Sequence, residues 1–161
     1  IILAAAAVLY DNLVAVQSQS YGPEARGGAT RTDIIIADSP IYFPKVIQPN
    51  VLVCLTQQAY AKFHSIIRPG GLLVTDSRFV QPEKRIAARH VELPMYQMVM
   101  DKIGRAIVFN ICMLGAIIGL TKVVQPESIM KVLEKQIPGN LLDMNRKALD
   151  LGLKLVEGRD V

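Results

Sequence analysis

The most distinctive stretch of the sequence, in chemical terms, is residues 18–28, Ser-Gln-Ser-Tyr-Gly-Pro-Glu-Ala-Arg-Gly-Gly. Its polar side chains, proline and glycines are unsuited to a regular helix or strand, so we expect a loop. Gly27 and Gly28 allow a sharp turn and a close approach to a ligand, and the Arg26 guanidinium is suited to a carboxylate or phosphate. Glu24 is placed to hold Arg26 by an ion pair. The loop is therefore a candidate anion-binding element. The alternative is a plain connection between two strands, with Arg26 in a surface ion pair of little energetic value.

The rest of the sequence has no pattern of a self-contained active site. The two histidines, His64 and His90, stand beside no nucleophile or metal-ligand motif. Cys54 and Cys112 lie in separate apolar runs, without a second cysteine or histidine at ligand spacing. We therefore predict no metal site and no catalytic residue. Two buried thiols are typical of a reducing compartment, so we expect a cytoplasmic location.

The composition is unusually apolar for a chain of 161 residues. Hydrophobic residues make up 51%, charged residues 20%, and the mean hydropathy is +0.31. This balance excludes a disordered tail and suggests that another subunit covers part of the surface. A net charge of +4 without tryptophan does not indicate a nucleic-acid-binding protein. The one basic cluster, Lys84, Arg85 and Arg89 with His90, is interpreted as a solvated face, with a phosphate-attracting patch as the alternative.

The apolar pattern predicts an α/β fold, with a mainly parallel sheet flanked by helices and a helical C-terminal third. The expected elements before the C-terminal third are a helix at 1–12, strands at 13–17, 29–37 and 51–55, a helix at 57–67, and strands at 72–75 and 87–93. Residues 51–75 form a strand, helix and strand, which predicts a βαβ unit. From Met95 onward every segment has a helical pattern. The length fits a single domain over 1–161, and a helix that begins at residue 1 suggests a preceding strand and turn.

A long uncharged segment lies between Arg105 and Lys122. It contains sixteen residues, whereas a spanning helix needs about 20, so we predict a helix buried within the protein rather than a membrane span. We expect Asn110 to be a hydrogen-bonded residue of the core, because buried polar groups normally have structural partners. A contact to a cofactor is the alternative for this residue.

Several segments together resemble one family. Residues 19–28, residues 38–41 (Asp-Ser-Pro-Ile) and the strand at 49–53 (Pro-Asn-Val-Leu-Val) are similar to the gamma subunit of 2-oxoacid:ferredoxin oxidoreductases, and most similar to the 2-oxoglutarate type. Residues 68–73 and 110–116 resemble later segments of the family, in order, so the resemblance extends over nearly the whole chain. The run Tyr-Gly-Pro-Glu-Ala-Arg-Gly-Gly is the specific signal. The Pro-Gly-Gly turn also occurs in methyltransferases.

The resemblance implies a multi-subunit enzyme that oxidatively decarboxylates a 2-oxoacid with coenzyme A, giving acyl-CoA, CO₂ and reduced ferredoxin. It implies alpha and beta subunits as partners, a ferredoxin-like subunit as a further candidate, and ferredoxin as the electron acceptor. Thiamine diphosphate, Mg and the [4Fe-4S] cluster would belong to the partner subunits, and the isolated chain would be inactive. The family usually opens with a strand and a Gly-Gly-Gln-Gly loop, which we expect to be missing before the Ile-Leu-Ala helix of this sequence.

Within this resemblance, the loop would lie near the active-site mouth and help to position coenzyme A. The predicted cofactor-binding residues are Tyr21, Gly22, Glu24, Arg26, Gly27 and Gly28. An equally open alternative places the loop against a partner subunit, with Tyr21 and Arg26 as interface anchors. Two other functions remain as alternatives: a non-catalytic scaffold subunit of the same complex, and a methyltransferase-like enzyme.

Overall fold

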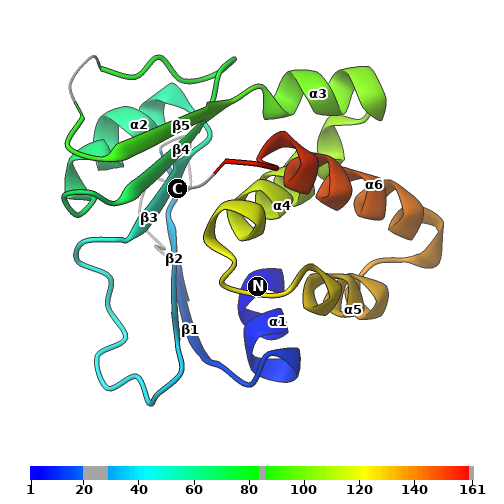
Figure 1. The fold of residues 1–161 in the computed structure, drawn as a ribbon, viewed down its shortest axis with the longest axis horizontal. Coiled ribbons are helices and arrows are strands. Elements are labelled where there is room, and N and C mark those ends of the chain that lie inside the picture. The colour runs from blue at the N-terminus through cyan, green and yellow to red at the C-terminus, as the bar shows by residue number, and fades with distance from the viewer. Residues whose placement is uncertain (20–28, 84–85, 160–161) are drawn as a thin grey trace. The chain divides into compact units, whose positions relative to one another are not determined.

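The computed structural model describes residues 1–19, 29–83 and 86–159 (Figure 1). In chain order the elements are α1 (Ile2–Tyr10), β1 (Val14–Gln19), β2 (Thr32–Ala37), β3 (Val51–Cys54), α2 (Gln57–Phe63), the 3₁₀ turn η2 (His64–Ile66), β4 (Leu72–Asp76), β5 (Arg89–Leu93), α3 (Met95–Lys102), the 3₁₀ turn η3 (Ala106–Val108), α4 (Phe109–Thr121), α5 (Pro126–Gln136) and α6 (Gly139–Leu155). The predicted α/β class with a helical C-terminal part is confirmed.

The chain divides into two compact units. The first unit contains Ile1–Val16, Ile35–Tyr42 and Met95–Val161, and the second contains Gln17–Ile34 and Phe43–Pro94. Strands β1 and β2 pair in a two-stranded sheet and run from one unit into the other. That one domain extends over residues 1–161 stays a prediction.

A three-stranded parallel sheet is the centre of the second unit. The strand order is β3-β4-β5, with Val51 opposite Leu72 and Val74 opposite Val91. All five residues of β4 are buried, as expected of a central parallel strand that is covered on both faces. The predicted βαβ unit is confirmed, because β3 and β4 are parallel and α2 lies between them in the chain.

The helix of this βαβ unit packs onto the sheet through a small apolar core. Thr56 caps α2, since its hydroxyl accepts a hydrogen bond of 3.2 Å from the amide of Ala59. The core cluster consists of Cys54, Tyr60, Ile67, Leu73 and Val80. Burial raises the pKa of the Cys54 thiol to about 11, so this cysteine is an inert core residue. The prediction that Cys54 and Cys112 are buried thiols is confirmed.

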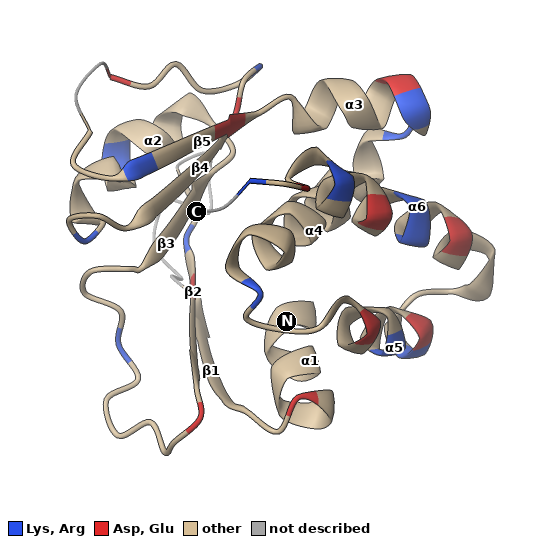
Figure 2. Cartoon of the chain, viewed as in Figure 1, with Lys and Arg blue, Asp and Glu red and all other residues tan. Residues whose placement is uncertain are grey.

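Helices make up most of the first unit, and α4 and α6 form its most extensive contact. Figure 2 shows charges on α5 and α6 and none on α4, whose thirteen residues are all uncharged. Seven residues of α4 are buried, so the prediction of a buried helix here is confirmed. The helix begins four residues later than Arg105. Gly104 has a positive φ of +74° and Arg105 is extended, so only the 3₁₀ turn η3 precedes α4.

The two helices approach closely because glycines lie where they cross. A Cβ atom added at Gly115 would lie 2.3 Å from the carbonyl oxygen of Leu149 on α6. A Cβ atom added at Gly152 would lie 1.9 Å from the carbonyl oxygen of Cys112 on α4. Real side chains do not tolerate such distances, so both positions require glycine for this packing.

Asp11 links the start of the chain to α5. Its carboxylate accepts a hydrogen bond of 2.7 Å from the amide of Gln125, the residue before α5, and a second, short hydrogen bond from the hydroxyl of Ser128. A carboxylate at a helix N-terminus satisfies free amides and opposes the positive end of the helix dipole. Asp11 is therefore the side-chain cap of α5, although it lies 114 residues before Gln125.

The first prediction concerns this cap. Replacing Asp11 with alanine should lower the free energy of unfolding by about 1–2 kcal/mol, because α5 loses its cap and the charge at its N-terminus. Urea denaturation followed by circular dichroism measures the effect. The control is Asp101→Ala on α3, an exposed residue whose loss should change stability by less than about 0.5 kcal/mol. Equal effects of the two substitutions would contradict the capping role.

Candidate functional site

The candidate anion-binding loop falls in a part of the chain outside the described residues. Tyr21, Gly22, Glu24, Arg26, Gly27 and Gly28 all lie between residues 20 and 28. The structure describes the strands on either side: β1 ends at Gln19, β2 begins at Thr32, and the two strands are neighbours in one sheet. The loop therefore connects two paired strands.

Arg31 fixes the chain where it leaves this loop. Its Nε lies 2.6 Å from Oδ1 of Asp33, and its Nη2 donates a hydrogen bond of 3.0 Å to the carbonyl oxygen of Val46. The guanidinium also lies 5.8 Å from the centre of the Phe63 ring. These contacts occupy Arg31, so its role is structural. The sequence signal for it was the Arg-x-Asp spacing, which places both side chains on one face of a strand.

A group of polar side chains includes the carboxyl end of β4, on the edge where α/β sheets commonly bind ligands. Thr75 and Asp76 end β4, and both are 0% exposed. The amide of Arg78 donates a hydrogen bond of 2.9 Å to Oδ1 of Asp76. Oγ1 of Thr75 and Nε2 of His90 on β5 are 2.8 Å apart and hydrogen-bonded. Among the described residues every buried polar side-chain atom has a partner, so this group stabilises the sheet.

His90 was part of the predicted basic cluster, but it bonds Thr75 instead of joining a surface patch. Arg89 beside it is exposed, and Lys84 and Arg85 lie outside the described residues. His64, the other histidine, donates a 2.8 Å hydrogen bond from Nδ1 to the carbonyl oxygen of Tyr60 and stacks on the Tyr60 ring. These contacts give His64 a packing role against Tyr60.

The second prediction follows from the burial of His90. Burial lowers the pKa of His90 below its usual value, and the nearby Glu92 carboxylate partly opposes this shift. The unfolded chain therefore binds a proton near pH 6.5 that the folded chain takes up only at lower pH. Folding stability should fall as the pH decreases from about 6.5 through the lowered pKa. His90→Gln should reduce this fall, measured as unfolding free energy at a series of pH values.

The control for this pH dependence is His64→Gln, which removes one histidine but leaves the contribution of His90 in place. Its stability should decrease toward low pH in the same window as that of the wild-type chain. A His90→Gln protein with an unchanged pH profile would show that His90 is not the titrating group.

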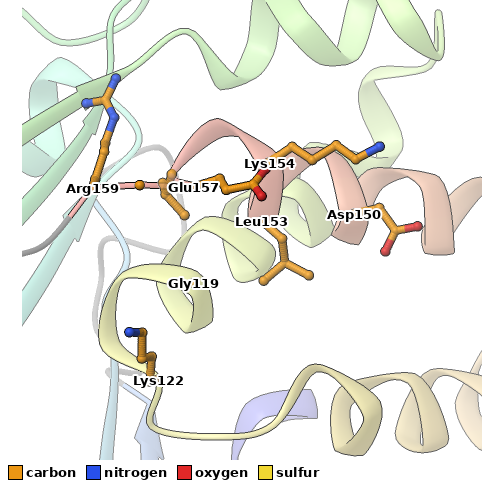
Figure 3. Close-up of a pocket in the computed structure, with 9 residues that line it drawn as sticks. Gly119, Lys122, Asp150, Leu153, Lys154, Glu157 and Arg159 are labelled. Atoms are coloured by element: carbon orange, nitrogen blue, oxygen red, sulfur yellow. The ribbon is translucent and has the colours of Figure 1, made fainter.

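A pocket of about 490 Å³ lies in the first unit, where α4 and α6 end. Its lining residues are Gly119, Lys122, Asp150, Leu153, Lys154, Val156, Glu157, Gly158 and Arg159. Figure 3 shows Lys122, Lys154 and Arg159 extending in different directions, so they do not converge on one anion. The helix C-termini carry partial negative charge, which disfavours phosphate. No local sequence pattern predicts this pocket, and its geometry does not match the anion site expected from the sequence.

Asn110 does not lie in the core, so the prediction for this residue is wrong. It is exposed, as the second residue of α4. Leu114 and Ile118 are buried on the same helix face, so Asn110 is exposed because it lies in the first turn of α4, where the helix begins. The alternative of a cofactor contact is compatible with an exposed amide at this place.

Neither a metal-ligand group nor a helix that could span a membrane is found among the described residues. Among them, no group of three or more His, Cys, Asp or Glu side chains is placed to hold a metal ion. None of the described helices combines the length and the apolar character needed to cross a bilayer.

Comparison with known proteins gives consistent results. The family model described as pyruvate ferredoxin/flavodoxin oxidoreductase matches residues 2–155. The 2-oxoglutarate synthase subunit KorC of Methanocaldococcus jannaschii is 42% identical over 159 residues, which are 98% of this chain and 85% of that protein. The crystal structure of a keto/oxoacid ferredoxin oxidoreductase gamma subunit from Geobacter sulfurreducens has a TM-score of 0.86 and 37% identity, covering 98% of this chain and 89% of that one.

A more distant structure has the same fold. It is 2-oxoglutarate:ferredoxin oxidoreductase from Magnetococcus marinus, with 2-oxoglutarate, coenzyme A and succinyl-CoA bound. Its TM-score is 0.82 at 20% identity, and the match covers 99% of this chain and 28% of that one. The predicted resemblance to 2-oxoacid:ferredoxin oxidoreductase gamma subunits is confirmed.

Proposed function

Because this chain belongs to the pyruvate ferredoxin/flavodoxin oxidoreductase family and is a subunit of a 2-oxoacid:ferredoxin oxidoreductase complex, we propose that its complex acts on 2-oxoglutarate. The complex would convert 2-oxoglutarate and coenzyme A to succinyl-CoA and CO₂ and pass two electrons to ferredoxin. The observation that supports this substrate is the 42% identity to a 2-oxoglutarate synthase subunit over 98% of the chain.

The partners proposed are the alpha and beta subunits of the same enzyme, with a ferredoxin-like subunit as a further candidate. Thiamine diphosphate, Mg and the [4Fe-4S] cluster would lie in these partners. The cysteine count supports that division for the cluster, since two cysteines are fewer than the four thiolates that hold a [4Fe-4S] cluster. The isolated chain is expected to be inactive. A cytoplasmic location stays a prediction.

Coenzyme A is proposed to bind near the Tyr21–Gly28 loop, with Arg26 contacting one of its anionic groups. The residue types of the loop support this role, since glycines allow a close backbone approach and arginine forms bidentate contacts with phosphate. The exposed amide of Asn110 is a second candidate contact. In the alternative, the loop lies at a subunit interface and this chain is a non-catalytic scaffold subunit. We do not propose a methyltransferase, because the family model matches residues 2–155.

Purification of the native complex through this chain tests the proposal. Chains that contain thiamine diphosphate and iron should co-elute, and the complex should reduce ferredoxin in the presence of 2-oxoglutarate and coenzyme A. Pyruvate and a branched 2-oxoacid serve as substrate controls. Faster turnover with either control would contradict the proposed substrate, and a chain that elutes alone would contradict the proposed complex.

The site at which coenzyme A labels the intact complex distinguishes the ligand-binding role from the scaffold role. Chemical cross-linking with a photoreactive coenzyme A analogue should label this chain near the Tyr21–Gly28 loop. Labelling confined to the partner subunits would favour the scaffold.

A further inference from the structure

Three large apolar side chains are exposed within one short segment, at residues 42–47. Tyr42 is 91% exposed, Phe43 63% and Ile47 67%. Single exposed apolar residues are ordinary on protein surfaces. Two aromatic residues and an isoleucine within six positions are less common, and such clusters mark interaction sites.

The backbone around these side chains is fixed. The carbonyl oxygen of Val46 accepts the 3.0 Å hydrogen bond from Arg31, and the amide of Lys45 donates a 2.9 Å hydrogen bond to the carbonyl oxygen of Phe43. Farther along, the amide of Arg68 bonds the carbonyl oxygen of Pro49 at 3.2 Å. Prolines at 40, 44 and 49 also restrict the chain. A segment held in this way loses little conformational entropy when it binds a partner.

Charge is nearly absent from the segment. Between Ser39 and Asn50 the only charged residue is Lys45, and Figure 2 shows the connection between β2 and β3 mostly in tan, with a red stretch where it leaves β2 and one blue stretch farther along. The centres of protein interfaces are likewise depleted of charge and enriched in aromatic residues. The segment therefore has the composition of an interface centre.

The position of Lys45 argues against a second copy of this chain as the occupant. Lys45 lies between Phe43 and Ile47 in the sequence. A two-fold symmetric contact centred on the segment would bring the two copies of Lys45 together, and like charges at an interface are unfavourable. A different chain would complement this surface if it offered apolar pockets and a carboxylate that pairs with Lys45.

We propose that residues 42–47 form a docking surface for another subunit of the oxidoreductase complex, one that presents apolar pockets and a nearby acidic side chain. The inference rests on the proposed function, since it needs a heteromeric complex. It differs from the interface alternative for the Tyr21–Gly28 loop, because it concerns a separate segment with described, anchored contacts.

The test uses the full complex, purified through this chain with the partner subunits present. The variants are Phe43→Ser with Ile47→Ser, and as a matched control Leu141→Ser, which alters an exposed apolar residue on α6. The double variant should lose affinity for its partners by about tenfold or more, and the control should retain it. Thermal unfolding of each purified chain checks that the variants fold.

A second measurement avoids any dependence on folding of the double variant. Phe43 is replaced by the photoreactive residue benzoylphenylalanine, and the irradiated complex is analysed by mass spectrometry. A cross-link to a partner subunit is the expected result. Undiminished partner binding by a folded double variant, or a cross-link only to a second copy, would overturn the docking surface while leaving the proposed function intact. A wild-type chain that retains no partner would overturn both.

Discussion

Replacing Gly152 with alanine is expected to lower the free energy of unfolding by about 3 kcal/mol or to prevent folding. The added Cβ would lie 1.9 Å from the carbonyl oxygen of Cys112 and 2.7 Å from the amide nitrogen of Ala116. Both are backbone atoms of α4, so no side-chain rotation relieves the overlap and the two helices must separate. The gain in helix propensity from glycine to alanine, about 1 kcal/mol, is too small to compensate.

Gly139→Ala is the matched control, because Gly139 begins the same helix and, apart from its chain neighbours and the backbone of its own helix, no described atom lies within 4 Å of its added Cβ. This variant should keep the wild-type stability or gain up to about 1 kcal/mol, since alanine restricts the unfolded chain. Urea denaturation of both variants gives the comparison. If Gly152→Ala unfolds at the same urea concentration as Gly139→Ala, the close crossing of α4 and α6 is wrong.

Local signals explain why the second unit was predictable. Three local signals follow one another within 25 residues: the apolar run of β3, the helical pattern of α2 and the Pro69-Gly70-Gly71 turn. The short connections between them limit where each following element can pack. Gly70 has a positive φ of +73°, as a tight turn of this kind requires. The parallel pairing of β3 with β4 then follows from the crossover helix.

Contacts between distant residues could not be predicted in the same way. Asp11 caps a helix 114 residues later, and no local pattern connects the two positions. The close approach of Gly115 on α4 to Gly152 on α6 likewise depends on the tertiary structure. The apolar neighbours of Asn110 predict a place in the core, whereas its exposure depends on α4 beginning only one residue earlier, at Phe109.

The candidate site was proposed from residue types and from family resemblance. Glycines, a glutamate and an arginine in one loop indicate a class of ligand, but not whether the ligand is coenzyme A or an acidic side chain of a partner subunit. The described structure adds the anchors of the loop, β1, β2 and Arg31. Those anchors are compatible with both roles, so the distinction requires a functional measurement.

Arg26→Ala is the substitution that separates the two roles. If Arg26 contacts an anionic group of coenzyme A, its loss should raise the KM for coenzyme A about 10- to 100-fold, which is the value of one charge-assisted hydrogen bond or bidentate contact. The subunits should still co-purify in normal proportions. Steady-state reduction of ferredoxin at a series of coenzyme A concentrations measures the change. Arg26→Lys should recover only part of the loss, because lysine keeps the charge but not the planar fork.

Arg146→Ala is the control for loss of one positive charge, since Arg146 is half-exposed and pairs with Glu134 on the surface. It should leave the KM for coenzyme A unchanged. Dissociation of the complex caused by Arg26→Ala would contradict the ligand role and favour an interface anchor. The Phe43 and Ile47 variants are expected to give the opposite pattern, weaker partner binding without a specific effect on coenzyme A. Together the two sets of variants assign ligand binding and subunit docking to different segments of this chain.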